Sequence, residues 1–154
     1  MKQLSHAAFA LVGLALASTV FVTRAQDTPP AELEPLVSVL ELMEKTITPA
    51  TNQLWSAYNA PETPAEWRVM EEASITLLAA SSLTAAGGTG PMDAEWARQP
   101  AWRAFNQAMI VAGKAALEAS RKQDAEALVA AGDLLLPPCE GCHQAFNPAV
   151  IGAE

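Results

Sequence analysis

The feature of this 154-residue sequence that most constrains its fold lies near the C-terminus, where it reads Cys139-Glu140-Gly141-Cys142-His143. On a helical turn, two thiols three residues apart can each add to a vinyl group of the same porphyrin. The histidine that follows then places an imidazole nitrogen under the iron. This C-x-x-C-H spacing is the attachment signature of a c-type haem. The sequence therefore predicts one covalent haem c, with Cys139 and Cys142 as thioether residues and His143 as the proximal iron ligand.

Two other uses of the cysteine pair agree less well with the sequence. A redox-active C-x-x-C pair needs a thioredoxin-like βαβ setting, and no segment here is typical of a strand. A structural zinc site needs four ligands. The chain holds only two Cys and two His, and the second histidine, His6, lies in a leader segment that we expect to be removed.

Residues 1–25 have the pattern of a cleaved secretory signal peptide. Lys2 gives a positive start, residues 7–22 form an apolar run, and small residues flank Arg24 where a signal peptidase would cut. An uncleaved membrane anchor is the alternative, but the apolar run is short for a span. Because c-type haem is attached outside the cytoplasmic membrane, the signal peptide and the C-x-x-C-H motif both indicate an exported protein. We expect residues 26–154 to form one periplasmic domain without a membrane span.

The charge of the mature chain restricts its partners. Cleavage removes Lys2 and Arg24 from the nine Lys and Arg residues, which leaves seven against 17 Asp and Glu, a net charge of −10. Such a surface repels nucleic acid and anionic lipid. We therefore expect a redox partner protein with a basic docking patch. No Ser/His/Asp set and no pair of acids suited to a catalytic cleft stands out, so the sequence does not predict an enzyme.

The fold class follows from composition and periodicity. Ala and Leu dominate while only 6% of residues are aromatic, which favours an all-α fold. Amphipathic patterns predict helices over about residues 31–58, 63–86, 100–121 and 124–146, and a short turn near Asp93. Short connections between them predict an antiparallel up-and-down four-helix bundle. The predicted core stripes are Leu36, Leu40, Met43, Ile47, Ala50 and Leu54; Met70, Ala73, Leu77, Ala80 and Thr84; Trp102, Phe105, Met109, Ala112, Ala116 and Ala119; and Leu128, Ala131 and Leu135.

Prolines and capping residues set the predicted helix ends. Thr63-Pro64-Ala65-Glu66 combines an N-cap, a proline in the first turn and a capping-box glutamate. Pro49 should kink the first helix or divide it after Thr48. The pair Pro137-Pro138 should end the last helix near Leu136 and start a separate haem-bearing turn.

With these helices and this motif, the chain resembles the cytochrome c′ family, the class II c-type cytochromes. The resemblance covers about residues 34–146. It implies a four-helix bundle that carries one haem on the C-x-x-C-H motif of its last helix, and it assigns the same three haem-binding residues as the motif does. The landmarks, in chain order, are Glu41-Leu42-Met43, Trp55, Thr63-Pro64-Ala65-Glu66-Trp67, and Cys139-Glu140-Gly141-Cys142-His143 followed by Phe146.

The resemblance also gives Met43 a role, because Met43 falls where the family places the residue facing the distal side of the iron. That residue is a Met ligand in low-spin members and a non-ligating apolar side chain in high-spin members. A structural reading stays open, since an adaptable Met on a core stripe can simply fill space. Two positions depart from the family pattern: Val39 stands where an Arg is often found, and Asn147 where a basic residue often follows the aromatic Phe146.

Three functions remain open from the sequence. The leading one is a periplasmic monohaem electron carrier with a His143/Met43-ligated haem. The second is a five-coordinate, high-spin protein that binds nitric oxide or carbon monoxide at an open distal face. The third is a cytochrome subunit of a larger dehydrogenase. Relatives in the family are often dimers built on their first two helices, so the resemblance also allows a homodimer.

Overall fold

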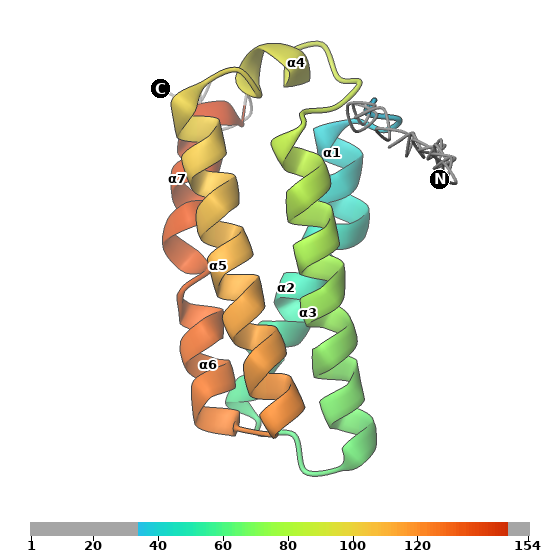
Figure 1. The fold of residues 1–154 in the computed structure, drawn as a ribbon, viewed down its shortest axis with the longest axis vertical. Coiled ribbons are helices and arrows are strands. Elements are labelled where there is room, and N and C mark those ends of the chain that lie inside the picture. The colour runs from blue at the N-terminus through green and yellow to red at the C-terminus, as the bar shows by residue number, and fades with distance from the viewer. Residues whose placement is uncertain (1–33, 148–154) are drawn as a thin grey trace, which may run out of the picture. The chain divides into compact units, whose positions relative to one another are not determined.

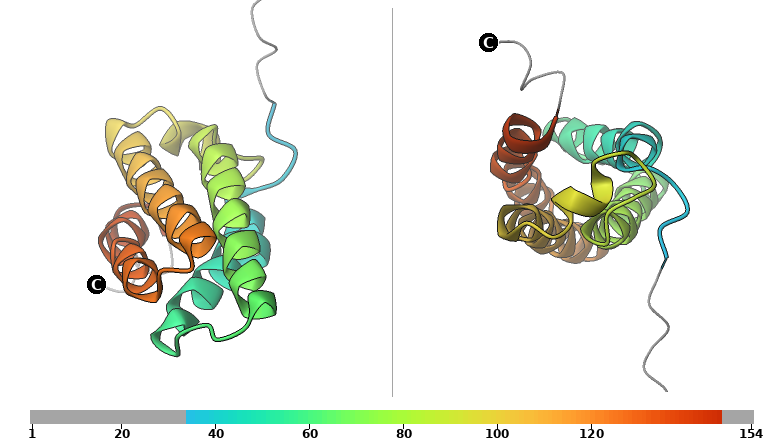
Figure 2. Two further views of the ribbon diagram at one scale, coloured as in Figure 1. Left: turned by 60° about the horizontal axis from the view of Figure 1, so that its bottom comes forward. Right: turned by 90° about the horizontal axis from the view of Figure 1, so that it is seen from above.

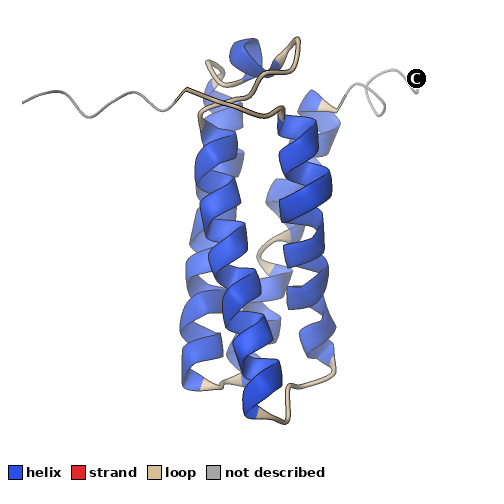
Figure 3. Ribbon diagram, turned by 90° about the vertical axis from the view of Figure 1, so that its right-hand side faces the viewer, coloured by secondary structure: helices blue, strands red, loops and turns tan. Residues whose placement is uncertain are grey.

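The computed structural model describes residues 34–147, and this part of the chain is all-α, as predicted, with helices joined by loops and no strand (Figure 1, Figure 3). A bilayer-spanning helix is absent from residues 34–147, since no helix there combines the necessary length and apolarity. The expected signal peptide, residues 1–25, lies outside the described residues, so its cleavage stays a prediction. The elements are α1 (Val39–Leu42), η1 (Met43–Ile47), α2 (Thr48–Trp55), η2 (Ser56–Tyr58), α3 (Pro64–Ala85), α4 (Asp93–Trp96), α5 (Pro100–Lys122), α6 (Ala125–Asp133) and α7 (Leu136–Phe146).

Helix α3 begins at the predicted capping box. The Glu66 backbone N–H donates to the Thr63 hydroxyl at 3.2 Å, and the Thr63 N–H donates to the Glu66 carboxylate at 2.8 Å. Each partner satisfies a donor that the first helical turn leaves free. At α6, the Ala127 N–H donates to the carboxylate of the predicted cap, Asp124, at 3.0 Å. The predicted starts of both helices are confirmed.

The first helix begins later than predicted. Residues 34–37 are not helical, and α1 starts at Val39 behind a second capping box. In it, the Glu41 N–H donates to the Ser38 hydroxyl at 3.2 Å and the Ser38 N–H donates to the Glu41 carboxylate at 2.8 Å. The predicted start near residue 31 is wrong because Ser38 and Glu41 form a capping box, and this local signal starts the helix although the apolar stripe continues before it.

Pro49 divides the first helical segment, one residue earlier than predicted. A π-helical turn, η1, covers Met43–Ile47, and the Thr48 N–H bonds to the Met43 carbonyl five residues back. Proline has no N–H, and its ring clashes with the carbonyl four residues before it in an α-helix, here that of Lys45. The wider turn relieves that clash. Such π-turns inside helices are frequent at functional sites.

The π-turn also changes which residues of the first stripe are buried. Leu36 is 86% exposed and Leu40 is 66% exposed, so the prediction that they lie in the core is wrong. Val39 and Leu42 are buried instead. One extra residue in a turn rotates the positions before it by about 100°, which moves the buried face by one residue.

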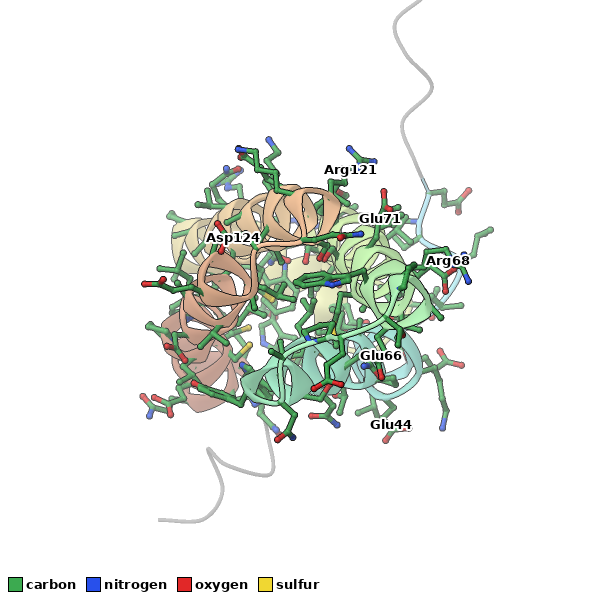
Figure 4. All side chains as sticks on the ribbon, turned by 90° about the horizontal axis from the view of Figure 1, so that it is seen from below. Glu44, Glu66, Arg68, Glu71, Arg121 and Asp124 are labelled. Atoms are coloured by element: carbon green, nitrogen blue, oxygen red, sulfur yellow. The ribbon has the colours of Figure 1, made fainter. Side chains whose placement is uncertain are left out.

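The other predicted stripes are confirmed, apart from Phe105, which is half-buried. The interior lies between four helices. Helices α3 and α5 pack along each other, α2 packs against α3 and α6, and α6 packs on α5 (Figure 1). Viewed end on, the α1–α2, α3, α5 and α6–α7 segments surround a common interior, and α4 crosses one end (Figure 2). One exposed ion pair, between Glu71 of α3 and Arg121 of α5 at 2.8 Å, joins the two long helices on the outside (Figure 4).

The last helical segment breaks before the C-x-x-C-H motif, as the two prolines predict, but the break lies earlier than predicted. Helix α6 ends at Asp133, three residues before the predicted end, and α7 starts at Leu136. Pro137 and Pro138 lie in the first turn of α7, where a missing N–H costs nothing because no helical acceptor would pair with it. The break separates the haem motif from α6.

Candidate functional site

The C-x-x-C-H motif lies on the middle of α7, between two packed clusters. Cys139 is half-buried and packs against the main core. Cys142 is 5% exposed and belongs to a second cluster with Val39, Trp102 and Phe146. His143 is exposed, and its ring has no hydrogen-bond partner within the described residues. Helix α7 therefore presents two shielded thiols and one free imidazole.

Gly141 explains how α7 docks against α5. A Cβ atom at this position would lie 2.6 Å from Cε1 of Phe105 and 2.9 Å from its Cζ. No side chain fits there unless Phe105 moves, and that ring packs edge-on against Phe146 with centroids 6.3 Å apart. The second variable position of the motif must stay small because α7 passes this close to an aromatic ring of α5.

Two neighbouring cavities open beside the motif. The outer cavity has a volume of about 630 Å³, and the inner cavity one of about 170 Å³. Both are lined by Met43, Thr48, Cys142 and His143, and Cys139 lines the inner one. Met43 lies 96 positions before Cys139 in the sequence. The fold nevertheless brings all four predicted site residues to the walls of these two cavities.

The outer cavity has an aromatic wall. Trp102 is 1% exposed and packs edge-on against Phe146 at 5.1 Å and stacked against Trp96 at 5.9 Å. Its indole N–H donates to the Thr84 carbonyl at 3.0 Å, which fixes the ring between α3 and α5. Buried aromatic side chains whose polar atoms are paired form a rigid apolar surface. This wall suits a large flat apolar ligand.

Asp93 is a site residue that the sequence analysis missed. Its side chain is buried and lines the outer cavity. One carboxylate oxygen, Oδ2, accepts from the Val39 N–H and the Gly90 N–H, both at 2.8 Å. A main-chain bond from the Thr89 N–H to the Val37 carbonyl, 3.0 Å long, runs beside it. Together these bonds fasten the loop before α4 to the start of α1.

A signal for Asp93 is present in the sequence. The stretch Gly87-Gly88-Thr89-Gly90 reads as a helix stop, but two of its glycines also make room for the carboxylate. A Cβ atom would lie 2.4 Å from Asp93 Oδ2 at Gly88 and 2.7 Å from it at Gly90. A run of glycines shortly before an aspartate therefore indicates a backbone that wraps around the acid, as well as a turn.

Both thiols are poor nucleophiles in this setting. Burial raises the pKa of the Cys139 thiol, and the Glu140 carboxylate raises it further. Burial raises the pKa of Cys142 to about 11, with a smaller contribution from Cys139. A dithiol oxidoreductase instead needs a thiol whose pKa is lowered towards neutrality. The environment of the pair thus disfavours a redox-active dithiol.

Metal-ligating side chains do not form a cluster within the described part of the chain. Within residues 34–147, no group of three or more His, Cys, Asp or Glu side chains could hold a bare metal ion. Acidic Glu44 and Asp93 line the outer cavity, and no Lys or Arg of the described residues lines either cavity. The site thus offers two thiols, one imidazole and one thioether in an apolar setting without a cationic side chain.

No family model, no curated protein and no solved structure matches this chain. The outer cavity falls in the range of roughly 300–1,000 Å³ typical of small-molecule sites. Leu40 and Met92 line it and are 66% and 39% exposed, and exposed apolar side chains around a hollow are typical of a ligand groove. The residues present fit a haem.

Proposed function

We propose that this chain is a periplasmic monohaem c-type cytochrome of the cytochrome c′ type that carries electrons. One observation carries the proposal: Met43, Cys142 and His143 line both cavities, and Cys139 lines the inner one. The motif supplies the attachment chemistry. The cavities supply an apolar volume on the side of α7 that bears the thiols. The agreement of the two features is the reason to prefer a haem protein over a dithiol enzyme or a zinc protein.

The fold proposed for this function is an antiparallel up-and-down four-helix bundle. Its four members would be α1–α2, α3, α5 and α6–α7, with the π-turn and the α6–α7 break as interruptions within two of them. The packing of α3 on α5, of α2 on α3 and α6, and of α6 and α7 on α5 supports this arrangement (Figure 2). Bundles of this type build cofactor sites from side chains on facing helices.

Each residue of the site has a distinct role in the proposal. Cys139 and Cys142 would hold the porphyrin by thioether bonds, and His143 would ligate the iron from α7. The bound haem supplies one-electron redox chemistry. The aromatic wall of Trp96, Trp102 and Phe146 excludes water from one face of the cavity. Helix α7 packs closely against α5 at Gly141. This contact fixes His143 of α7 relative to the aromatic wall.

Met43 is proposed as the distal ligand, which is the feature that favours a carrier. It is the first residue of the π-turn, half-buried, and in contact with both hydrophobic clusters. A flexible thioether in this position can adapt its reach. Soft sulfur ligation favours ferrous iron and raises the reduction potential. His143 is the only histidine among the described residues, so no imidazole there competes with Met43.

The gas-binding alternative rests on the outer cavity. It extends past Met43 to Leu40 and Met92, whose exposed side chains leave a route from solvent. If Met43 does not ligate, the iron would be five-coordinate and open to nitric oxide or carbon monoxide. Met43 would then act as a steric lid.

The proposed partner of the carrier is a redox protein with a basic docking patch, because the mature chain carries a net charge of −10. Complementary charge speeds the encounter of two proteins more than it tightens their complex. A homodimer stays compatible with the proposal, and no residue is proposed to act as a catalyst.

Covalent attachment is the first test of the proposal. Haem should stay with the polypeptide through denaturing electrophoresis of protein made in a host that matures c-type cytochromes. The double substitution Cys139→Ala with Cys142→Ala should abolish this, because no thioether bond can form. Haem that extracts into acidified organic solvent from the wild-type protein would overturn the proposal.

Substitution of Met43 tests the choice between carrier and gas binder. Met43→Ala should convert a low-spin ferric spectrum to a high-spin one and lower the midpoint potential, because the iron loses its sulfur ligand. Met109→Ala is a matched control, since Met109 also lines the inner cavity and is not assigned to the iron. A wild-type protein that is already high-spin and binds carbon monoxide readily when reduced would favour the gas binder.

A further inference from the structure

Asp93 is a buried acid without a cationic partner. Its side chain is 4% exposed. Within residues 34–147, no ion pair includes Asp93, and no Lys or Arg lines either cavity. Burying a charge is unfavourable unless the charge is paired or hydrogen-bonded. The negative charge of the Asp93 carboxylate is therefore held in place by hydrogen bonds and not by an opposite charge.

The two carboxylate oxygens of Asp93 have different environments. Oδ2 accepts from the N–H groups of Val39 and Gly90, both at 2.8 Å. Oδ1 has no hydrogen-bond partner among the described residues, yet it is not one of the fully enclosed unpaired oxygens, such as Oγ1 of Thr51. Oδ1 thus keeps some accessible surface. Because Asp93 lines the outer cavity, Oδ1 is the side-chain oxygen that can face this cavity.

Helix α4 brings this carboxylate to the proposed haem site. The helix crosses one end of the space between the long helices (Figure 2). Asp93 and Trp96, one turn apart on α4, both line the outer cavity, and so do Cys142 and His143 of the motif. A haem attached at the motif would therefore share this cavity with the Asp93 carboxylate. Buried charges interact more strongly than exposed ones, because less water lies between them.

We propose that Asp93 helps to set the reduction potential of the haem: its negative charge, which no cation offsets, stabilises the ferric state and lowers the potential. The inference rests on the proposed function, since it assumes haem at the motif. Ferric iron carries one more positive charge than ferrous iron, so a nearby carboxylate favours the ferric state. Sulfur ligation by Met43 acts in the opposite direction. Two residues that line the outer cavity would thus move the potential in opposite directions.

The charge of Asp93 can be separated from its hydrogen bonds by substitution. Asp93→Asn removes the charge but keeps an oxygen that accepts from the Val39 and Gly90 N–H groups. Asp93→Ser is a second neutral variant, with a hydroxyl oxygen as the acceptor. A purely structural role predicts the wild-type potential in Asp93→Asn, whereas the proposed role of the charge predicts a higher potential in both variants.

Glu44→Gln is the matched control. Glu44 also lines the outer cavity, but its side chain is 55% exposed and the Lys45 ammonium lies 3.5 Å from its carboxylate. Water, salt and Lys45 therefore weaken the effect of this charge on the haem. At about 1 M salt the Debye length is about 3 Å, so Glu44→Gln should have the wild-type potential. The shift in Asp93→Asn should persist, because a buried charge is screened much less.

The experiment measures the midpoint potentials of haem-loaded wild type and the three variants by optical redox titration, at about 0.01 M and about 1 M salt. Both Asp93 variants should have a higher potential than wild type. At the ambient potential that reduces half of the wild-type protein, their ratio of reduced to oxidised haem should be roughly threefold to tenfold higher. Unfolding in denaturant checks that each variant is folded under the same conditions.

The proposal is overturned if Asp93→Asn keeps or lowers the wild-type potential, or if its shift disappears at high salt. A rise in Asp93→Ser without one in folded Asp93→Asn would also overturn it, because a changed backbone and not the charge would then be the cause. If Asp93→Asn does not fold, the salt-independent shift of Asp93→Ser decides the question. Failure of the proposed function differs visibly, because the wild type would then carry no haem after denaturing electrophoresis.

Discussion

The two halves of the described helices fill their interiors in different ways. The closed half, built from α2, α3, α5 and α6, is filled by its own side chains. Leu77, Ala112, Ala116 and Leu128 there have no exposed surface. At Gly113, a Cβ atom would come within 3.0 Å of Leu78, so α3 and α5 are in close contact. This half has a complete core without any ligand.

The open half, where α1, η1, α4, α7 and the first turn of α5 meet, is filled only in part. Its buried cluster consists of Val39, Trp102, Cys142 and Phe146, and cavities of about 630 and 170 Å³ lie beside it. The apolar side chains that line a cavity lack contact atoms on one side and therefore lose dispersion energy there. The closed half therefore supplies most of the buried core, while the open half keeps the apolar cavities in which the haem is proposed to bind.

The largest effect expected from this comparison is a cavity in the closed half. Leu77→Ala should lower the free energy of unfolding by about 2–5 kcal/mol. The loss should be equal in haem-loaded protein and in the haem-free Cys139→Ala/Cys142→Ala variant, because Leu77 contacts neither cavity. Denaturant titrations would measure both values. Leu83→Ala is the control, since this leucine is 45% exposed and should cost roughly 0.5 kcal/mol or less. A loss confined to the haem-loaded form would contradict the division into halves.

A smaller effect is expected at the bond that closes the open half. Asp93→Ala should cost about 1–3 kcal/mol, because the N–H groups of Val39 and Gly90 lose their acceptor. Asp93→Asn should retain most of the stability, since an amide oxygen can accept the same two bonds. Denaturant unfolding together with hydrogen exchange at the two amides would measure the change. Equal losses in both variants would mean that the charge matters more than the hydrogen bonds.

The smallest expected effect is a loss of helix capping in acid. It can be compared between the two halves, because the cap of α1 lies in the open half and the cap of α3 in the closed half. Hydrogen bonds from Ser38 lower the pKa of Glu41, and bonds from Glu62 and Thr63 lower the pKa of Glu66, in each case from an ordinary value of 4.5. A carboxyl whose folded-state pKa is lowered stabilises the fold above its ordinary pKa, and this contribution is lost as the pH falls through the folded-state value.

The Ser38 and Thr63 amide resonances should therefore shift as their caps protonate below pH 4.5. Nuclear magnetic resonance would follow both amides across the titration. Glu41→Gln and Glu66→Gln should keep the caps and abolish their pH dependence, because a neutral amide oxygen accepts the same bonds. Fraying only at Ser38 would show that the cap of the open half depends on more than local geometry.

The sequence alone determined the helical class, the helix ends marked by Thr63 and Asp124, and the core stripes of α3 and α6. These features are local, because capping and a 3.6-residue period act within a few turns. It also determined the haem-motif prediction, whose three residues lie within five positions of each other. Whether these residues bind haem stays a prediction, but their chemical character needed no tertiary structure.

Long-range packing sets which residues surround the C-x-x-C-H motif. The π-turn at Met43 accommodates Pro49, and the packing of this segment on α3 shows that the buried face moves from Leu40 to Val39. The glycines before Asp93 indicate a tight backbone around it, but its bond to the Val39 N–H joins segments 54 residues apart, and no local pattern predicts that partner. Local rules fix what a residue can do on its own element. The neighbours that give a residue its function are set by long-range packing, which the helical periodicity of the sequence does not predict.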